Sequence, residues 1–153
     1  MAQTLSGGCL CGAVRYTVSA DFIFSGKCYC EDCRRGGTSG HNSVYAVPEP
    51  SVNVTGKLTE FTKKGGSGQP ITRRFCPVCG SKIATTAAAM PGVTLLSASS
   101  LDDPEKFVSQ MSIFTSRAPS WDRPMCRRFR RCRRRREVRA KRGRIYFSAL
   151  SPP

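Results

Sequence analysis

Three cysteines lie within six consecutive positions of the chain, in the stretch "CYCEDC". They are Cys28, Cys30 and Cys33, and two arginines and two glycines follow directly. Three thiols cannot pair completely as disulfides, and three thiolates are one short of a closed zinc tetrahedron. Catalytic zinc sites have this arrangement, since they combine three protein ligands with one exchangeable position. The trio therefore predicts an open, catalytic zinc site.

Two other cysteine pairs lie far apart in the sequence. Cys9 and Cys11 form a C-x-C, while Cys76 and Cys79 belong to "CPVCG", a zinc-knuckle turn in which Gly80 can adopt the left-handed conformation. A knuckle presents two thiolates to one metal and needs a second pair, which Cys9 and Cys11 can supply. We therefore predict a structural zinc at these four cysteines, and two Zn²⁺ ions per chain.

Two alternatives exist for the knuckle. A C-x-x-C can be a redox dithiol, but such a motif begins a long helix after a strand, and "GSKIATTAA" offers no such helix. Ordinary zinc-ribbon modules use two C-x-x-C knuckles, whereas this chain combines one knuckle with a C-x-C. Both alternatives fit the spacing less well than a structural zinc does.

The trio also indicates the kind of reaction. Three thiolates leave Zn²⁺ with a net charge of about −1, which favours binding a soft substrate sulfur over activating water. Arg34 and Arg35 are candidates for holding an anionic thiol substrate, because guanidinium groups pair well with carboxylates; the alternative is that both are solvated. His41 is either a fourth ligand, an acid–base group or neither. We expect Glu31 and Asp32 to be solvent-facing spacers.

The elements that position these cysteines are predicted to be short strands. Val14, Tyr16 and Val18 alternate with polar residues, as in a half-buried strand. Residues 63–70 read as a hairpin tip and 101–107 as one helical turn, and no segment sustains a long helical period. We therefore expect a mainly β fold of short antiparallel strands with little helix. Further strand candidates are 42–50 and 51–62, which repeat this alternation, and 71–75, 81–88, 92–101 and 108–116.

Composition narrows the class of protein. A chain of 153 residues with 39% hydrophobic residues has room for one domain. Nine cysteines in close clusters, without a visible export signal, favour metal binding over disulfides. No apolar run reaches the roughly 18 residues of a membrane helix. We therefore expect a soluble protein of a reducing compartment, the cytoplasm, with no membrane partner.

The net charge of +15 is concentrated at the C-terminal end. Residues 1–122 hold 12 basic and 9 acidic residues, whereas 123–153 hold 13 basic residues and one acid. We therefore divide the chain into a domain of residues 1–122 and an Arg-rich tail of residues 123–153. Three interpretations of the tail stay open: a disordered solvated segment, a nucleic-acid-binding arm compatible with the nucleus, or the product of a shifted reading frame or retained intron.

The cysteine motifs "GGCLCGAVRY", "CYCEDCRRGG" and "RRFCPVCGSKI", in this order, resemble those of the glutathione-dependent formaldehyde-activating enzyme family, which includes centromere protein V. The resemblance covers roughly residues 5–122. It implies a β-tent-like fold, a structural zinc at the two outer pairs and a catalytic zinc at the trio. It also implies a carbon–sulfur lyase that joins glutathione to formaldehyde as S-hydroxymethylglutathione. The alternative is a non-catalytic, zinc-stabilised binding module whose basic tail binds nucleic acid.

Overall fold

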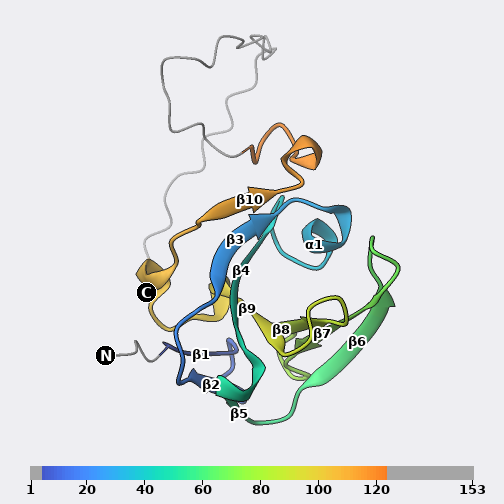
Figure 1. The fold of residues 1–153 in the computed structure, drawn as a ribbon. Helices are drawn as coiled ribbons and strands as arrows, with labels where there is room; N and C mark the ends of the chain where they lie inside the picture. The colour runs from blue at the N-terminus through green and yellow to red at the C-terminus, as the bar shows by residue number, and fades with distance from the viewer. Residues whose placement is uncertain (1–4, 124–153) are drawn as a thin grey trace.

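The structure, a computed structural model, describes residues 5–123 (Figure 1). Within them, strands form two sheets, and the mainly β fold with little helix is confirmed. The smaller, antiparallel sheet has the order β1-β2-β5, with β1 at Leu5–Gly8, β2 at Arg15–Val18 and β5 at Val52–Thr55. The larger sheet has seven strands in the order β10-β3-β4-β9-β8-β7-β6. Their bounds are Met111–Ile113 (β10), Phe24–Cys28 (β3), Asn42–Pro48 (β4), Val93–Ser97 (β9), Lys82–Ala87 (β8), Pro70–Phe75 (β7) and Thr59–Lys64 (β6).

Helical structure in the described residues is limited to short pieces. The α-helix, α1, spans Glu31–Arg35, directly after β3. The turn expected at 101–107 is confirmed as the 3₁₀ helix η3, in which the Asp103 carboxylate accepts from the Glu105 N–H at 3.1 Å. The 3₁₀ helices are η1 (Glu49–Ser51), η2 (Ala98–Ser100), η3 (Pro104–Lys106) and η4 (Thr115–Arg117).

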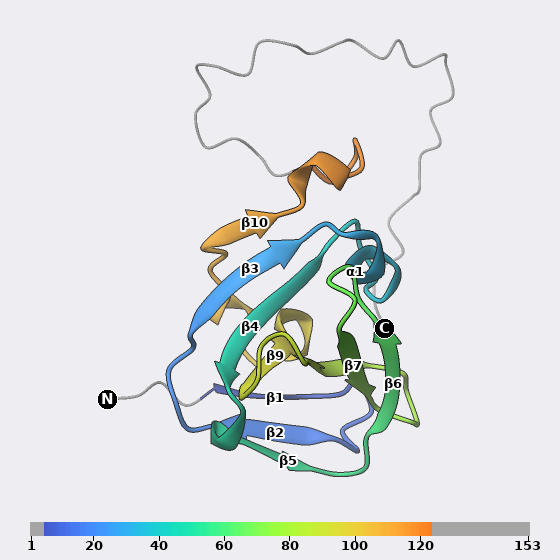
Figure 2. The same cartoon turned by 45° about the vertical axis from the view of Figure 1, so that its right-hand side comes forward.

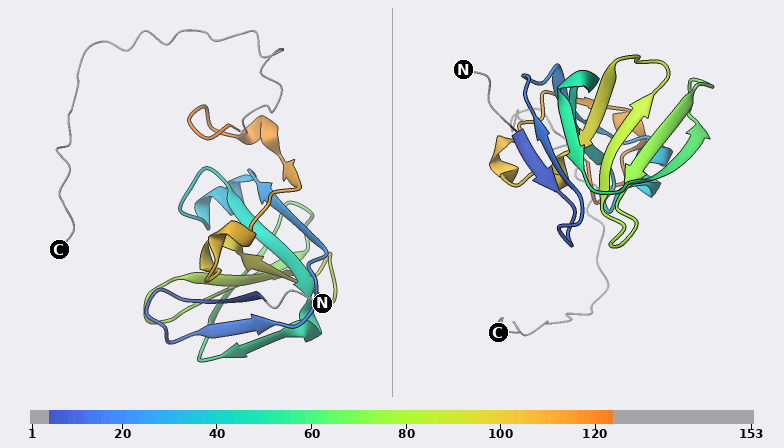
Figure 3. Two further views of the ribbon diagram at one scale, coloured as in Figure 1. Left: turned by 90° about the vertical axis from the view of Figure 1, so that its left-hand side faces the viewer. Right: turned by 90° about the horizontal axis from the view of Figure 1, so that it is seen from below.

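The hydrophobic core lies between the two sheets. Figure 2 shows the small sheet crossing one end of the molecule while the large sheet curves over it, and Figure 3 shows the same two layers from further sides. Two of the four cysteines predicted to hold a structural zinc, Cys9 and Cys76, are part of this core. Its other main members are Leu5, Val14, Tyr16 and Val18 from the small-sheet region and Tyr45, Val47, Ile83 and Leu96 from the large sheet.

The predicted strands and hairpin tip are present, but two strands are shorter than predicted: 92–101 divides into β9 and η2, and 108–116 contains β10 and part of η4. Residues 42–50 were expected to alternate, but β4 is buried from Val44 to Val47, because it lies in the middle of the large sheet between β3 and β9. Most pairings are antiparallel, as expected, but β10 pairs with β3 in parallel. In the hairpin tip at 63–70, the Gly65 N–H donates to the Gln69 carbonyl at 2.9 Å.

The domain of residues 1–122 and the described residues nearly coincide. The Arg-rich tail of 123–153 lies, apart from Arg123, outside the described residues, so its three interpretations stay predictions. No helix in residues 5–123 is both long enough and apolar enough to cross a membrane.

Candidate metal centres

The structure brings the two outer cysteine pairs together. The sulfur atoms of Cys9, Cys11, Cys76 and Cys79 all lie within 4.8 Å of one another. Cys9 Sγ is 3.5 Å from Cys11 Sγ, which is 3.8 Å from Cys76 Sγ. Tetrahedral zinc with Zn–S bonds of about 2.3 Å separates its sulfurs by about 3.8 Å. The four thiols therefore fit a closed zinc site in number, chemistry and spacing.

Local backbone geometry explains how the knuckle forms. Gly80 has φ +71°, the left-handed conformation predicted for it, and its N–H donates to the Cys76 carbonyl at 2.9 Å. The Cys76 N–H donates to the Ser81 carbonyl at 3.0 Å. Ser81 Oγ accepts from the Leu10 N–H at 3.1 Å, which connects the knuckle to the loop of the first cysteine pair. These contacts thus shape the knuckle turn and join it to the loop that carries Cys9 and Cys11.

The electrostatics of this group favour a bound cation. The Ser81 hydroxyl and N–H lower the pKa of Cys79 to about 5. Burial raises the pKa of Cys9, but the Val14 N–H and neighbouring thiols lower it more, so the pKa falls overall. A backbone N–H lowers the pKa of Cys11, yet the neighbouring sulfurs raise it to about 12. Holding all four thiolates together therefore requires a positive charge between them.

The trio forms the second group, at the junction of β3 and α1. The sulfurs of Cys28, Cys30 and Cys33 lie within 4.8 Å of one another, and all three residues are half-buried. Cys28 is the last residue of β3, and Cys30 caps α1, accepting from the Cys33 N–H at 3.4 Å. The strand end and the first helical turn thus gather the three sulfurs locally.

Charge also accumulates at the trio. The Cys33 thiol donates to Cys28 and lowers the pKa of Cys28 to about 6, whereas the same contact and burial raise the pKa of Cys33. Lys82, at the start of β8, interacts electrostatically with all three sulfurs, and burial lowers the pKa of its ammonium group. Sequence reasoning missed Lys82. The sequence feature that could have indicated Lys82 is its position in a predicted strand directly after the knuckle.

Asp32 corrects one expectation for α1. It was predicted to be a solvent-facing spacer, but its carboxylate is half-buried and accepts from Lys63 Nζ at 2.8 Å, with Arg73 at 3.7 Å. Lys63 in particular holds the pKa of Asp32 below its usual value. Glu31 is exposed, as expected. Asp32 therefore ties α1 to the hairpin of β6 and β7.

Arg34 and Arg35 have different surroundings. Arg35 Nε donates to Glu31 Oε1 at 2.8 Å, an exposed pair within α1. Arg34 lines a cavity of about 360 Å³ together with Tyr29, Glu31 and Arg117. Sequence reasoning missed Arg117, which lies on η4.

His41 lies apart from the trio's sulfurs. Its Nδ1 is 2.6 Å from Asp122 Oδ2, to which Ser39 Oγ also donates at 3.2 Å, and its ring packs against Tyr29 with centroids 5.1 Å apart. Among the described residues, the ligand-type side chains grouped at the trio are the three cysteines alone. The structure therefore does not place His41 as a fourth ligand.

Comparisons with known proteins agree with this architecture. A crystal structure of a Rhodobacter sphaeroides protein is similar in fold, with 23% sequence identity and a TM-score of 0.52 over 66% of this chain and 93% of that one. No curated protein matches the chain. The family model described as glutathione-dependent formaldehyde-activating enzyme matches residues 4–117, which confirms the family predicted from the cysteine motifs. The chain belongs to the glutathione-dependent formaldehyde-activating enzyme family.

Proposed function

We propose that this protein is a zinc-dependent carbon–sulfur lyase that joins a small thiol, such as glutathione, to an aldehyde, such as formaldehyde. The observation that carries the proposal is the difference between the two cysteine groups. One group has four sulfurs, enough to close a tetrahedral site, and the other has three. The family supports glutathione-dependent formaldehyde activation in general.

Each group has its own role in this proposal. Cys9, Cys11, Cys76 and Cys79 hold a structural zinc, and Cys28, Cys30 and Cys33 hold the catalytic one. When bound at the trio, zinc keeps a substrate thiol in its deprotonated form. The free thiols of all seven described cysteines are consistent with a reducing compartment, and we propose the cytoplasm.

The reaction needs little from the chain beyond binding and charge. The thiol gives up its proton, its sulfur forms a bond to the carbonyl carbon, and the C=O π electrons move to oxygen, which takes up a proton. The product is S-hydroxymethylglutathione when the partners are glutathione and formaldehyde. Lys82, which interacts with the charges of the trio, offsets part of the negative charge that a substrate thiolate adds there.

Zinc stoichiometry tests the metal part of the proposal. We expect two zinc ions in the full chain purified under reducing conditions, and one in Cys30→Ser, measured by inductively coupled plasma mass spectrometry. Cys126→Ser is the matched control, because it makes the same chemical change outside the three cysteine motifs, and it should retain two zinc ions. A wild-type protein with one zinc ion or none contradicts the proposal.

Exchange spectroscopy tests the reaction. Formaldehyde and glutathione combine slowly without a catalyst, so ¹³C-labelled formaldehyde lets NMR follow the exchange between its hydrate and S-hydroxymethylglutathione. The wild-type protein should raise the exchange rate in proportion to its concentration, and Cys30→Ser should abolish the increase while Cys126→Ser preserves it. An unchanged rate with the two-zinc protein refutes the proposed reaction.

A further inference from the structure

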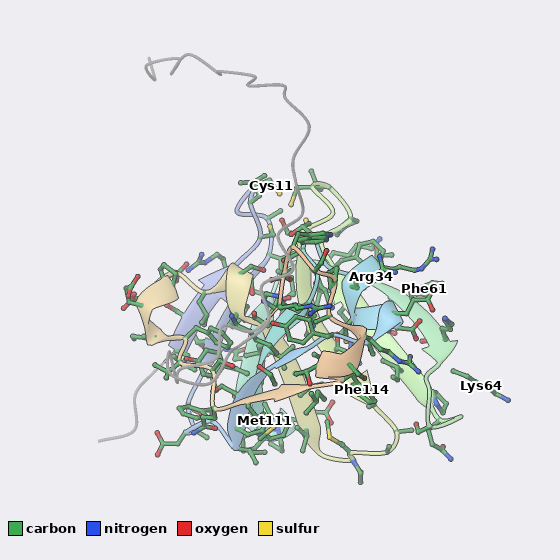
Figure 4. The ribbon with its side chains drawn as sticks, turned by 90° about the horizontal axis from the view of Figure 1, so that it is seen from above. Cys11, Arg34, Phe61, Lys64, Met111 and Phe114 are labelled. Atoms are coloured by element: carbon green, nitrogen blue, oxygen red, sulfur yellow. The ribbon has the colours of Figure 1, made fainter. Side chains whose placement is uncertain are left out.

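A polar cavity is lined in part by residues of the segment that carries the trio. It measures about 360 Å³ and is lined by Tyr29, Glu31, Arg34 and Arg117. Arg34 comes from α1 and Arg117 from η4, segments far apart in the sequence. Figure 4 labels Arg34 on α1 and Phe114 at the start of η4, and Figure 1 shows both segments at the same end of the molecule. Two guanidinium groups thus meet at one cavity.

Arg34 and Arg117 differ from four other described arginines, which form ion pairs with carboxylates. In the described part of the chain, neither Arg34 nor Arg117 makes an ion pair with a carboxylate. A guanidinium fork matches a carboxylate in charge and shape. Two such groups at one cavity without a carboxylate partner therefore favour an anionic ligand. The paired arginines are Arg15 with Asp102, Arg35 with Glu31, Arg73 with Asp32, and Arg74 with Glu60.

The segment that carries Arg117 is attached to the strand that carries the trio. β10 pairs in parallel with β3, and this close approach requires Gly26, since a Cβ there would lie 2.8 Å from Met111 Cγ. The pairing continues beyond the strand, where the Ile113 carbonyl accepts from the Tyr29 N–H at 3.1 Å. The chain that leads to Arg117 is thus fixed next to the trio.

The turn between β10 and η4 contains a residue with an unfavourable backbone conformation, Phe114. Phe114 has φ +55°, the one positive φ of a non-glycine residue in the described chain, and its carbonyl accepts from the Arg117 N–H at 2.9 Å. Left-handed backbone is unfavourable at a residue with a Cβ and is retained where the surroundings impose it. Phe114 thus turns the chain from β10 into η4, which carries Arg117.

We propose that Arg34 and Arg117 bind a carboxylate of the thiol substrate while its sulfur occupies the trio. The proposal rests on the proposed function and narrows the substrate class to thiols that carry an amino-acid carboxylate. Tyr29 lies between Cys28 and Cys30 in the sequence and Arg34 directly follows Cys33, so the cavity is built on the segment that carries the trio. Glu31, the acidic group of the lining, is paired with Arg35, so the charge that the cavity offers a ligand comes from Arg34 and Arg117.

A thiol-free peptide tests this site separately from the chemistry. The probe is γ-glutamyl-α-aminobutyryl-glycine, which keeps both carboxylates and the ammonium group of glutathione but has no sulfur. Isothermal titration of the zinc-loaded full chain should detect binding, weakened about tenfold or more by Arg117→Ala and by Arg34→Ala. Arg74→Ala, which removes an arginine elsewhere on the surface, should bind like the wild type. Arg117→Lys keeps the positive charge but not the guanidinium fork, so its affinity for the peptide should lie between that of the wild type and that of Arg117→Ala.

The outcomes separate this proposal from the proposed reaction. The dimethyl ester of the probe lacks both carboxylates, so it should bind weakly and equally to the wild type and to Arg117→Ala. No binding of the peptide, or equal binding of the peptide by the wild type and Arg117→Ala, overturns the carboxylate site. Arginine-dependent binding in a protein that fails the formaldehyde exchange assay refutes the reaction and supports the site.

Discussion

The two cysteine groups differ in their surroundings as well as in their number of sulfurs. Cys9 and Cys76 are buried in the core between the sheets, so these two candidate zinc ligands also pack against core side chains. The trio is half-buried on a strand end and a short helix. A structural zinc contributes roughly 10–16 kcal/mol of apparent binding free energy in small peptides, which is comparable with the net stability of a domain. We therefore expect the two groups to affect stability differently.

The corresponding prediction compares Cys9→Ser with Cys30→Ser. Cys9→Ser should lose the cooperative thermal unfolding transition, because it removes a zinc ligand from within the core. Cys30→Ser should retain that transition, because the second group is not needed to join the sheets. Circular dichroism during heating measures both. Equal loss of the transition in the two variants would show that the trio is also structural.

Gly80 is a second residue whose role can be isolated. Gly80→Ala should lower the free energy of unfolding of the zinc-loaded protein by about 1–2 kcal/mol, because alanine strains the left-handed backbone. A Cβ at Gly80 meets nothing within 4 Å, so the cost is conformational rather than steric. Gly66→Ala is the control, with equal open space and no positive φ. Urea titration should show a clear loss only at Gly80.

At the scale of elements, polar contacts join the ends of the small sheet to the large one. Asp102, which follows η2, accepts from Arg15 Nη1 at 2.8 Å and from Ser6 Oγ at 2.7 Å. Arg15 is on β2 and Ser6 is on β1, so one carboxylate contacts both strands. The loop that follows β9 and η2 is thereby fixed to the sheet that leads into the first cysteine pair.

This contact predicts a pH dependence of stability. Hydrogen bonds from Arg15, then Ser6, lower the pKa of Asp102 to about 2, below its ordinary value of 3.8. A depressed carboxyl pKa stabilises the folded state above the unfolded pKa, and the contribution disappears as the pH falls through the folded pKa. Asp102→Asn should therefore lower the melting temperature at pH 7 and reduce its decline between pH 4 and 2. Asp21→Asn, at an exposed position, should follow the wild type, and the same profile for both variants would contradict the prediction.

At the scale of the whole molecule, the last described residues belong to the domain. Asp122 contacts both His41 and Ser39, and Gly40 lies directly beneath it, since a Cβ at Gly40 would lie 2.4 Å from the Asp122 carboxylate. The Arg-rich tail begins immediately afterwards. We therefore propose that the folded unit ends at about residue 122, as the change in charge predicts.

Two truncations test this boundary. A chain that ends at Arg123 should keep the melting temperature and zinc content of the full chain, whereas one that ends at Trp121 should melt lower because it loses the Asp122 contacts. The chain that ends at Arg123 should also lose any salt-dependent binding of nucleic acid, since it lacks 12 of the 13 basic residues of the tail. A full-length protein that is more stable than the chain ending at Arg123 would place the tail within the folded unit.

Much of the fold and the metal centres could be predicted because the signals are local. Alternating Val14, Tyr16 and Val18 predicted β2, and spacing alone grouped the trio, since cysteines two or three positions apart cannot separate far. β1 and β3 were not predicted. β1 has the sequence "LSGG", with little intrinsic strand preference, and it forms because β2 supplies the hydrogen-bonding partner.

The sequence by itself determined the cysteine spacing, the left-handed glycine of the knuckle and the division of charge along the chain. Covalent connectivity restricts each of these within a few residues, so no distant contact is needed to define them. Only the tertiary structure decided which remote side chains join them: Lys82 beside the trio, Asp122 on His41, and Arg117 across the cavity from Arg34. These contacts depend on strand order and register, including the parallel pairing of β10 with β3, and the cost of closing such long loops is repaid only by the complete fold.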